Sequence, residues 1–292
     1  MEKAIEKAGI LVEALGYILS FTDKRLVIKL GGAAMTGAAE LTDTLTDVVF
    51  LAAVGMKPVL VHGGGPAVSQ AMKEMGKQPK FVNGRRVTDR ETLEVVKQVL
   101  VERINADIAR EINRLGGMAG QVYPDCDDCI TAKPLKLVDE EGKEYDLGFV
   151  GEVAGVNVGV LDRLLAHDII PVIAPLGADE GGQHYNINAD TVASEVAVNL
   201  RCEKLVYMSD THGIYTNAAD PTSLASHLSE REISELVADG TITSGMLPKV
   251  EGCLRAVKAG VRKAHIIDGR IPHSLLLEIF TAKGIGTEIV LS

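Results

Sequence analysis

The sequence lacks tryptophan, and aromatic residues make up only 4% of its 292 residues. Base stacking and aromatic-rich protein interfaces depend on such side chains, so neither is expected here. A basic surface is also missing, because the net charge is −10 and the pI is about 5.2. Nucleic acid and anionic membranes are therefore not expected as partners, whereas a local basic pocket for a small anion is still allowed.

Long apolar runs and a cysteine framework are missing as well. The longest apolar stretches, such as 48–56, fall well short of the roughly 20 residues that a membrane helix needs. The N-terminus, Met-Glu-Lys-Ala, carries acids in its first turns, so neither secretion nor organelle import is signalled. Four cysteines in so long a chain do not form a disulfide framework, which predicts reduced thiols and a cytoplasmic location.

Glycine-rich strand exits stand out in the first quarter of the chain. The run 26–35, LVIKLGGAAM, places Lys29 near the end of an apolar strand and then delivers two glycines to a turn. The run 58–65, PVLVHGGG, repeats the design. Because an ammonium at the mouth of a buried strand needs an anionic partner, these exits predict an anion site. That site is not a standard P-loop, since neither GxxxxGK[ST] nor GxGxxG is present.

Strand, glycine turn and helix alternate along most of the chain, which is typical of an α/β fold with a mainly parallel sheet. Helices are expected at 1–19, 38–54, 66–75, 90–115, 162–167, 191–200, 249–259 and 272–281. Beyond the first two strands, further strands are expected at 169–174, 204–208, 265–268 and within 284–290. Thr88 is the expected cap of the helix at 90–115, and short hairpins are expected over 121–157.

The N-terminal helix has a wide apolar stripe that must pack either on its own domain or on another copy of the chain. Spacing alone does not choose between these alternatives. The glycine-rich loop 177–182 is the best candidate for a boundary between two lobes. We therefore expect an N-terminal helix over 1–24, one lobe over 25–180 and a second lobe over 181–292.

One cysteine pair, Cys126 and Cys129, has CxxC spacing. A single pair supplies only two zinc ligands, and no second pair or HxxxH follows at useful spacing. An exposed loop is the favoured interpretation, with metal binding or redox use as the alternatives.

Phosphoryl transfer needs positive charge around a migrating phosphoryl group, together with backbone N–H groups that can reach its oxygens. Lys29 and Lys249 both lie beside glycine loops, and Asp190 lies between them in the sequence. The set suits this chemistry, although its members are too far apart in sequence for spacing to prove that they meet.

Specific motifs add to this reading, in the order VIKLGG, VLVHGGGPAVSQAM, NGRRVTD, YNINADTVASEVA, VYMSDTHGIYT, ITSGMLPKVEGCLRAV and HIIDGRIPHSLLLEIFTAKGIGTEIV. In that order they resemble the amino acid kinase family, and within it the N-acetyl-L-glutamate kinases of the arginine-sensitive hexameric type. The resemblance implies an open three-layer αβα sandwich, with an N-terminal lobe for N-acetylglutamate and a C-terminal lobe for ATP with Mg2+. The implied reaction makes N-acetyl-L-glutamyl 5-phosphate, the second step of arginine biosynthesis.

The resemblance assigns catalytic roles by position. Lys29 and Lys249 would stabilise charge on the transferring phosphoryl group, and Asp190 would orient both lysines rather than act as a base. A carboxylate nucleophile is already ionised near neutral pH, so no general base is needed. Gly32 would line the phosphate path, and Mg2+ would be held mainly by ATP rather than by protein ligands.

For the substrate, the resemblance implies Gly64 and Gly65 at the acyl-glutamate, Arg86 at its α-carboxylate and Asn186 at its acetamide region. A planar guanidinium pairs with a carboxylate in bidentate fashion, which suits Arg86. Arg85 is instead interpreted as a solvated charge. The residues that the resemblance implies at ATP are Gly31, Ser209, Asp210, Gly213, Ile214, Tyr215, Ser244, Gly245 and Met246.

The two ends of the chain resemble those of the arginine-inhibited members of the family. In those proteins an N-terminal helix interlaces dimers into a hexamer, a trimer of dimers. By this match the effector arginine would bind near Tyr17, His265, Glu278 and Gly284, although a solvated helix-face residue is the ordinary interpretation of Glu278. The residues leave open whether a PII-type signal protein also binds.

Two other function classes stay open. A relative that acts on carrier-bound aminoadipate, aspartate or glutamate would share the lysines but differ around NGRRVTD and NxNAD. A non-catalytic arginine sensor would lack Lys29, Asp190 or Lys249. All three are present, which favours an enzyme. Departures from the usual family pattern, at Ala33, His212 and Glu288, remove no charge that the chemistry needs.

Overall fold

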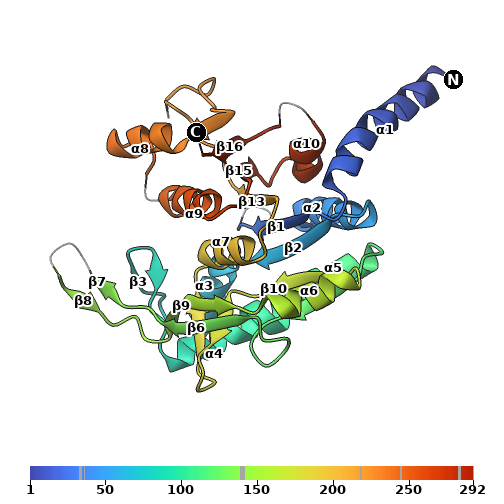
Figure 1. Ribbon diagram of the computed structural model, residues 1–292. Coiled ribbons are helices and arrows are strands. Elements are labelled where there is room, and N and C mark those ends of the chain that lie inside the picture. The colour runs from blue at the N-terminus through green and yellow to red at the C-terminus, as the bar shows by residue number, and fades with distance from the viewer. Residues whose placement is uncertain are drawn as a thin grey trace.

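A single central sheet organises the molecule, seen in a computed structural model that describes all residues except 33, 34, 36, 139–141, 218, 244, 282, 283 and 292. In the part of the chain so described, the sheet has eight strands (Figure 1). Their spatial order is β14 (His227–Ser229), β16 (Thr287–Val290), β15 (Lys263–Asp268), β13 (Lys204–Ser209), β1 (Arg25–Leu30), β2 (Lys57–His62), β10 (Ile170–Ile173) and β5 (Ala119–Val122). Among the described strands of this sheet, only β15 and β16 pair antiparallel, so the expected mainly parallel sheet is confirmed.

Helices cover both faces of this sheet, which confirms the three-layer sandwich (Figure 1). The alternation of side chains along β1 explains the layers. Leu26, Ile28 and Leu30 point into one buried cluster, with α2 (Ala38–Ala53), α5 (Ala106–Arg114) and α10 (Ser274–Phe280). Val27 points into the opposite cluster, with α6 (Val158–Ala166), α7 (Ala189–Asn199), α8 (Glu230–Ala238) and α9 (Leu247–Lys258).

Smaller sheets lie beside the main one. The strands β6 (Ile130–Pro134), β9 (Val150–Val156), β11 (Leu176–Ala178) and β12 (His184–Ile187) close on one another. Two short hairpins join β3 (Phe81–Val82) to β4 (Arg85–Arg86) and β7 (Leu137–Val138) to β8 (Glu144–Tyr145). The expected hairpin region began too early, because residues 121 and 122 belong to β5, which lies parallel to β10 in the main sheet.

The proposed lobe boundary falls between 180 and 181, in the turn that joins β11 to β12. Those two strands pair with each other and belong to the same small sheet. The division into lobes therefore remains a proposal, and a boundary after Ile187 would respect this strand pairing better.

The expected helix at 90–115 is continuous but changes register in its middle. It comprises α4 (Arg90–Lys97), the π-helical segment η2 (Gln98–Asn105) and α5. The predicted cap was wrong: Asp89 precedes the helix, and its Oδ1 accepts the Thr92 N–H at 2.8 Å. The Thr88 hydroxyl instead donates to the Arg86 carbonyl at 2.9 Å and accepts from Nδ2 of Asn186 at 3.2 Å. The other helix on this side, α3, spans Gly65–Glu74.

The helix α1 (Glu2–Phe21) projects away from the body of the molecule, with the N-terminus at its far end (Figure 1). Its described apolar side chains are largely exposed, for example Val12 at 71% and Leu19 at 69%. Only its C-terminal end meets the body, where the Tyr17 and Phe280 rings pack edge to face with centroids 6.3 Å apart. Docking on its own domain is therefore not what this helix does. No helix built from the described residues is both long and apolar enough to cross a membrane.

The Cys126–Cys129 segment is not simply an exposed loop. Cys129 is buried in the core beside Ile130, and burial raises the pKa of its thiol to about 12. Such a thiol is a poor source of reactive thiolate. The exposed-loop interpretation is therefore wrong for Cys129, and its protonated thiol gives no support to redox use.

Candidate active site

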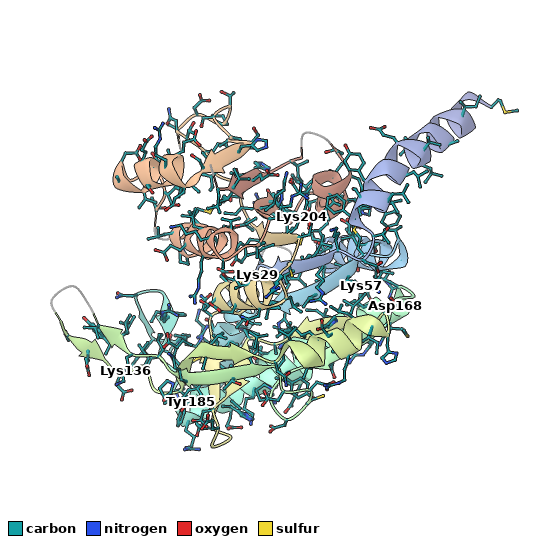
Figure 2. The ribbon with its side chains drawn as sticks, viewed as in Figure 1. Lys29, Lys57, Lys136, Asp168, Tyr185 and Lys204 are labelled. Carbon is teal, nitrogen blue, oxygen red and sulfur yellow. The ribbon has the colours of Figure 1, made fainter. Side chains whose placement is uncertain are left out.

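Lys29 occupies the centre of the molecule, on the central strand β1 (Figure 2). The alternation that points Val27 toward α7 points Lys29 the same way. Its Nζ lies 2.8 Å from Oδ1 of Asp190, and the lysine side chain is only 9% exposed. The buried ammonium thus has the anionic partner that its position in the strand demands.

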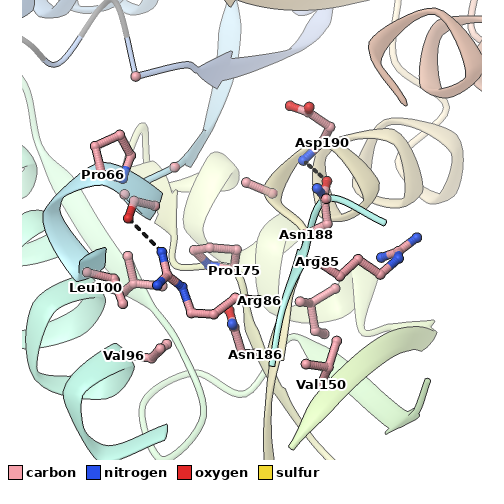
Figure 3. Close-up of a pocket in the computed structure, with 18 of the residues that line it drawn as sticks. Pro66, Arg85, Arg86, Val96, Leu100, Val150, Pro175, Asn186, Asn188 and Asp190 are labelled. Carbon is pink, nitrogen blue, oxygen red and sulfur yellow. Dashed lines mark hydrogen bonds between the residues drawn. The ribbon is translucent and has the colours of Figure 1, made fainter. Parts of the chain in front are cut away.

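Asp190 stands in the first turn of α7, where the helix dipole favours negative charge. The Asn188 side chain caps this helix and accepts the Asp190 N–H at 2.8 Å (Figure 3). The second carboxylate oxygen of Asp190, Oδ2, lies 3.6 Å from Nζ of Lys249. Burial by itself would raise the pKa of Asp190, but the two lysines outweigh it and hold the pKa below its usual value.

Lys249 reaches Asp190 because α9 packs closely on α7 and β13. Ser194 on α7 donates its hydroxyl to the Gly252 carbonyl at 3.1 Å. A Cβ at Gly252 would lie 2.5 Å from the Tyr207 hydroxyl, so only glycine permits this approach. That hydroxyl donates to the Asp190 carbonyl at 2.8 Å, which ties the start of α7 to the sheet. The three charged residues that the sequence could not prove to converge do converge.

A cavity of about 260 Å³ opens beside this triad (Figure 3). Most of the predicted catalytic and substrate residues line it, namely Lys29, Gly32, Gly64, Gly65, Arg86, Asn186 and Asp190. They come from strand exits and helix starts that are far apart in sequence, which is where open α/β sheets bind ligands.

Arg86 is held in place on the wall of this cavity. Its Nη2 donates to the Gly65 carbonyl at 2.8 Å and to the Ser69 hydroxyl at 2.7 Å (Figure 3). Its guanidinium stacks on the Phe81 ring, 4.8 Å from the centroid. Burial lowers the pKa of Arg86, yet arginine stays charged because its ordinary pKa is so high. The site therefore contains a fixed cation suited to a carboxylate.

The predicted ATP residues lie at neighbouring places rather than in this cavity. A Cβ on Gly31 would run into the Met208 carbonyl, so Gly31 lies directly beside the end of β13. Ser209 ends that strand, and the chain then continues through Asp210, Gly213, Ile214 and Tyr215. The Ile214 N–H is fixed by the Thr287 hydroxyl at 2.8 Å.

The remaining predicted ATP residues lie near the start of α9. Gly245 lines a second cavity of about 590 Å³, together with Pro248 and Arg85. Met246 immediately precedes the helix. Ser244 lies outside the described residues.

Metal binding by the protein has no support in this geometry. The described residues contain no group of three or more His, Cys, Asp or Glu side chains that could hold a metal ion.

Comparison with known proteins identifies the family. Residues 24–268 match the model of the amino acid kinase family. The chain belongs to the amino acid kinase family. It is 47% identical over 289 residues to the acetylglutamate kinase of Moorella thermoacetica, covering 98% of each chain. Acetylglutamate kinases from other organisms match at 45% to 49% identity. Because these matches cover nearly the full chain, this protein is an enzyme, a phosphotransferase.

A solved structure outside the kinases also matches this member of the family. It is an N-acetylglutamate synthase from Neisseria gonorrhoeae complexed with coenzyme A and N-acetyl-glutamate, with 27% identity and a TM-score of 0.86. The match covers 98% of this chain but spans only 63% of the synthase. The same synthase complexed with coenzyme A and L-arginine matches with 26% identity and a TM-score of 0.82, spanning 65% of that chain.

The structure also gathers the residues expected at an effector site on this kinase. Nδ1 of His265 lies 2.7 Å from Oε1 of Glu278, and Oε2 of Glu278 accepts the Ile285 N–H at 2.9 Å. A Cβ at Gly284 would lie 2.8 Å from Oε2 of Glu278. Tyr17 reaches the same helix, α10, through its contact with Phe280. Glu278 is buried, so the solvated helix-face interpretation is wrong.

Sequence reasoning missed Lys204, which lies next to the His265–Glu278 cluster, beside α10 and β15 (Figure 2). Its ammonium packs over the Phe21 ring at 5.1 Å from the centroid. Burial lowers the pKa of Lys204, and the negative charge of Glu278 acts against that. Lys204 stands at the start of its strand, whereas Lys29 stands near the end of its strand and before two glycines, so the pattern that pointed to Lys29 does not point to Lys204.

The packing of the glycine turn after β2 against Leu100 and Ile104 can be tested by substitution. Gly64 has φ of +155°, and a Cβ there would overlap Leu100 and lie 2.8 Å from Ile104, whereas a Cβ at Gly65 would meet nothing within 4 Å. We expect Gly64→Ala to lower the free energy of unfolding by about 2 kcal/mol or more, from backbone strain and overpacking. Gly65→Ala should change it by less than about 1 kcal/mol. Chemical denaturation measures both, and equal losses would contradict the packing.

Proposed function

We propose that this kinase transfers the γ-phosphoryl group of ATP to the side-chain carboxylate of N-acetyl-L-glutamate, the second step of arginine biosynthesis. The observation that carries the proposal is the buried triad of Lys29, Asp190 and Lys249 at the edge of a cavity whose wall holds Arg86. The similarity to acetylglutamate kinases over nearly the full chain supports the choice of substrate.

Charge stabilisation is the main catalytic contribution in this proposal. Negative charge on the phosphoryl group must be neutralised while the group passes from the leaving oxygen of ATP to the attacking carboxylate oxygen. Lys29 and Lys249 provide two ammonium groups for this. Asp190 contacts both and keeps them from repelling each other. The acceptor carboxylate is already ionised, so Asp190 is not required as a base.

Substrate binding follows from the opposite wall of the cavity. Arg86 would pair with the α-carboxylate of N-acetylglutamate, since its planar guanidinium suits bidentate contact. Asn186 would meet the acetamide, and its own Nδ2 is oriented by a hydrogen bond to the Thr88 hydroxyl at 3.2 Å. Gly64 and Gly65 would meet the acyl-glutamate where its side-chain carboxylate receives the phosphoryl group, so that the Gly64 N–H also lies on the phosphate path.

ATP would lie on the other lobe, along the exit of β13 and the start of α9. Magnesium would come with its phosphates, which need such a cation to offset their charge. In this arrangement residues 25–180 provide most contacts with acetylglutamate, joined by Asn186, and residues 181–292 provide most contacts with ATP, joined by Gly31. A cytoplasmic location, where ATP is available, belongs to the same proposal.

The substrate assignment can be tested directly by trapping the acyl phosphate with hydroxylamine. We expect ATP-dependent hydroxamate formation with N-acetylglutamate and much less with glutamate or aspartate, because the acetamide contact is missing from both. Turnover of free glutamate that equals or exceeds that of N-acetylglutamate would sink the assignment.

A second test separates charge stabilisation from binding. Lys249→Ala should lower kcat by roughly 100-fold or more while changing KM far less, because the lost interaction forms mainly in the transition state. Lys258→Ala is the matched control, since Lys258 lies on the same helix and its side chain is half exposed. Loss confined to KM, or equal loss in the control, would contradict the role of Lys249.

We also propose that arginine inhibits this enzyme and that α1 assembles dimers into a hexamer. The effector would bind at the cluster of His265, Glu278 and Gly284, close to Tyr17 on α1. A buried carboxylate suits a guanidinium, and a structural neighbour with 26% identity is complexed with L-arginine. The exposed apolar side chains of α1 are those that a second copy would cover.

Deleting residues 1–20 tests both parts of this proposal. The shortened protein should sediment as a smaller oligomer and should need more arginine for half-inhibition, while its hydroxamate assay still reports activity. Replacing Leu11 alone by Ala provides a milder comparison, since its side chain is 69% exposed in a single copy. If the shortened protein still sediments as a hexamer, the proposed role of α1 is refuted.

A further inference from the structure

His62 is a completely buried histidine at the end of β2 for which the proposed function has no use. Its Nδ1 lies 2.7 Å from the carbonyl oxygen of Gly63, the first glycine of the turn that lines the cavity. Its Nε2 lies 3.1 Å from Nδ2 of Asn105. The ring itself does not line the cavity.

The neighbours of His62 fix its protonation in one way. Nδ2 of Asn105 donates to the Val172 carbonyl at 2.9 Å, so the amide nitrogen, and not the amide oxygen, faces this part of the core. Its second hydrogen then points to Nε2 of His62, which must accept. The Gly63 carbonyl can only accept, so Nδ1 must carry the proton. Both contacts therefore demand the same neutral tautomer, and burial lowers the pKa of His62 to about 4.

The glycine turn has every carbonyl engaged by the protein. His62 Nδ1–H donates to the Gly63 carbonyl, the Val68 N–H donates to the Gly64 carbonyl at 3.0 Å, and Arg86 donates to the Gly65 carbonyl. In contrast, no described group accepts from the N–H of Gly64, and the N–H of Gly65 belongs to the unpaired first turn of α3.

Peptide planarity links these two facts. In a trans peptide the carbonyl of one residue and the N–H of the next point in opposite directions. When His62 holds the Gly63 carbonyl toward the core, the Gly64 N–H must therefore point away from the ring, on the side where Gly64 lines the cavity.

The π-helical segment η2 holds this arrangement from behind. It ends at Asn105, which supports the His62 ring, and two of its side chains, Leu100 and Ile104, leave no room for a Cβ at Gly64. The same segment, η2, thus fixes both the backbone at Gly64 and the ring of His62. π-Turns inside α-helices are frequent at functional sites, which agrees with this position.

We propose that His62 is a positioning residue that, through the Gly63 carbonyl, aims the Gly64 N–H at the phosphoryl group in transit. The inference rests on the proposed function. It assigns the orientation of the backbone donor to one buried side chain and its partner Asn105. A backbone donor aimed at developing charge acts mainly in the transition state.

Two substitutions separate the two contacts of the ring. In His62→Asn the amide nitrogen takes the place of Nδ1 and can still donate to the Gly63 carbonyl, whereas the contact with Asn105 is lost. In His62→Gln the amide oxygen takes the place of Nε2 and can still accept from Nδ2 of Asn105, whereas the donor to the Gly63 carbonyl is lost. Each variant leaves the lost partner and one end of its own amide unpaired in the core, so both should lose a similar amount of thermal stability.

The expected result is a difference in kcat between these matched variants. His62→Asn should keep kcat within about threefold of the wild type, and His62→Gln should lose about tenfold or more, with KM for the carboxylate little changed. Equal kcat values in the two variants, or kcat that simply follows Tm, would overturn the positioning role. If His62→Gln does not fold, His62→Leu replaces it, because leucine also lacks a donor to the Gly63 carbonyl, and unchanged kcat there would overturn the role as well.

A readout without substrate keeps this inference separate from the substrate assignment. Hydrogen exchange of the segment 63–68 should be faster in His62→Gln than in His62→Asn, because the turn is then no longer held. Wild-type enzyme that fails to phosphorylate N-acetylglutamate would refute the proposed function alone. Equal exchange in the two variants would refute the role of His62 alone.

Discussion

The buried contact of Asp190 with Lys29 and Lys249 is the interaction on which the rest of the structure depends. Charges taken out of water cost several kcal/mol each unless they are paired, so each lysine needs this carboxylate. The pairing in turn fixes where α7 and α9 must sit on the sheet, because Asp190 begins one helix and Lys249 lies in the first turn of the other. Gly252 and Tyr207 make the necessary approach sterically feasible.

The parallel sheet converts this local pairing into a site. Strands that run in the same direction end at the same edge, so the exits of β1, β2 and β13 deliver their glycines and polar residues together. At the exit of β2, donors from the protein engage the carbonyl oxygens of residues 63–65, and backbone N–H groups of the same turn are left for a ligand in the cavity. Such a surface is suited to anions, and it explains how an acidic protein with a net charge of −10 can offer a positive pocket.

The strand β13 also connects the candidate active site to the region proposed to bind arginine. It begins at Lys204, beside the cluster of His265 and Glu278, and ends at Ser209, beside Gly31. If arginine binds at the proposed site, a rigid strand between it and the active site is a simple physical route for coupling, provided that the two ends have alternative arrangements. The projecting helix α1 lies at the Lys204 end, through the contact of Phe21 with that lysine.

The sequence by itself determined the alternation of strands and helices, the mainly parallel sheet and the residue types of the site, because periodicity, glycine turns and motifs are local properties. Tertiary structure decided what depends on neighbours distant in sequence. Asp89 caps α4 while the Thr88 hydroxyl bonds Arg86 and Asn186, Cys129 is buried because β6 follows it into the core, and α1 stands exposed because no described surface of its own chain covers it. The tautomer of His62 belongs to the same class, since Asn105 and the Val172 carbonyl reach it only in the folded chain.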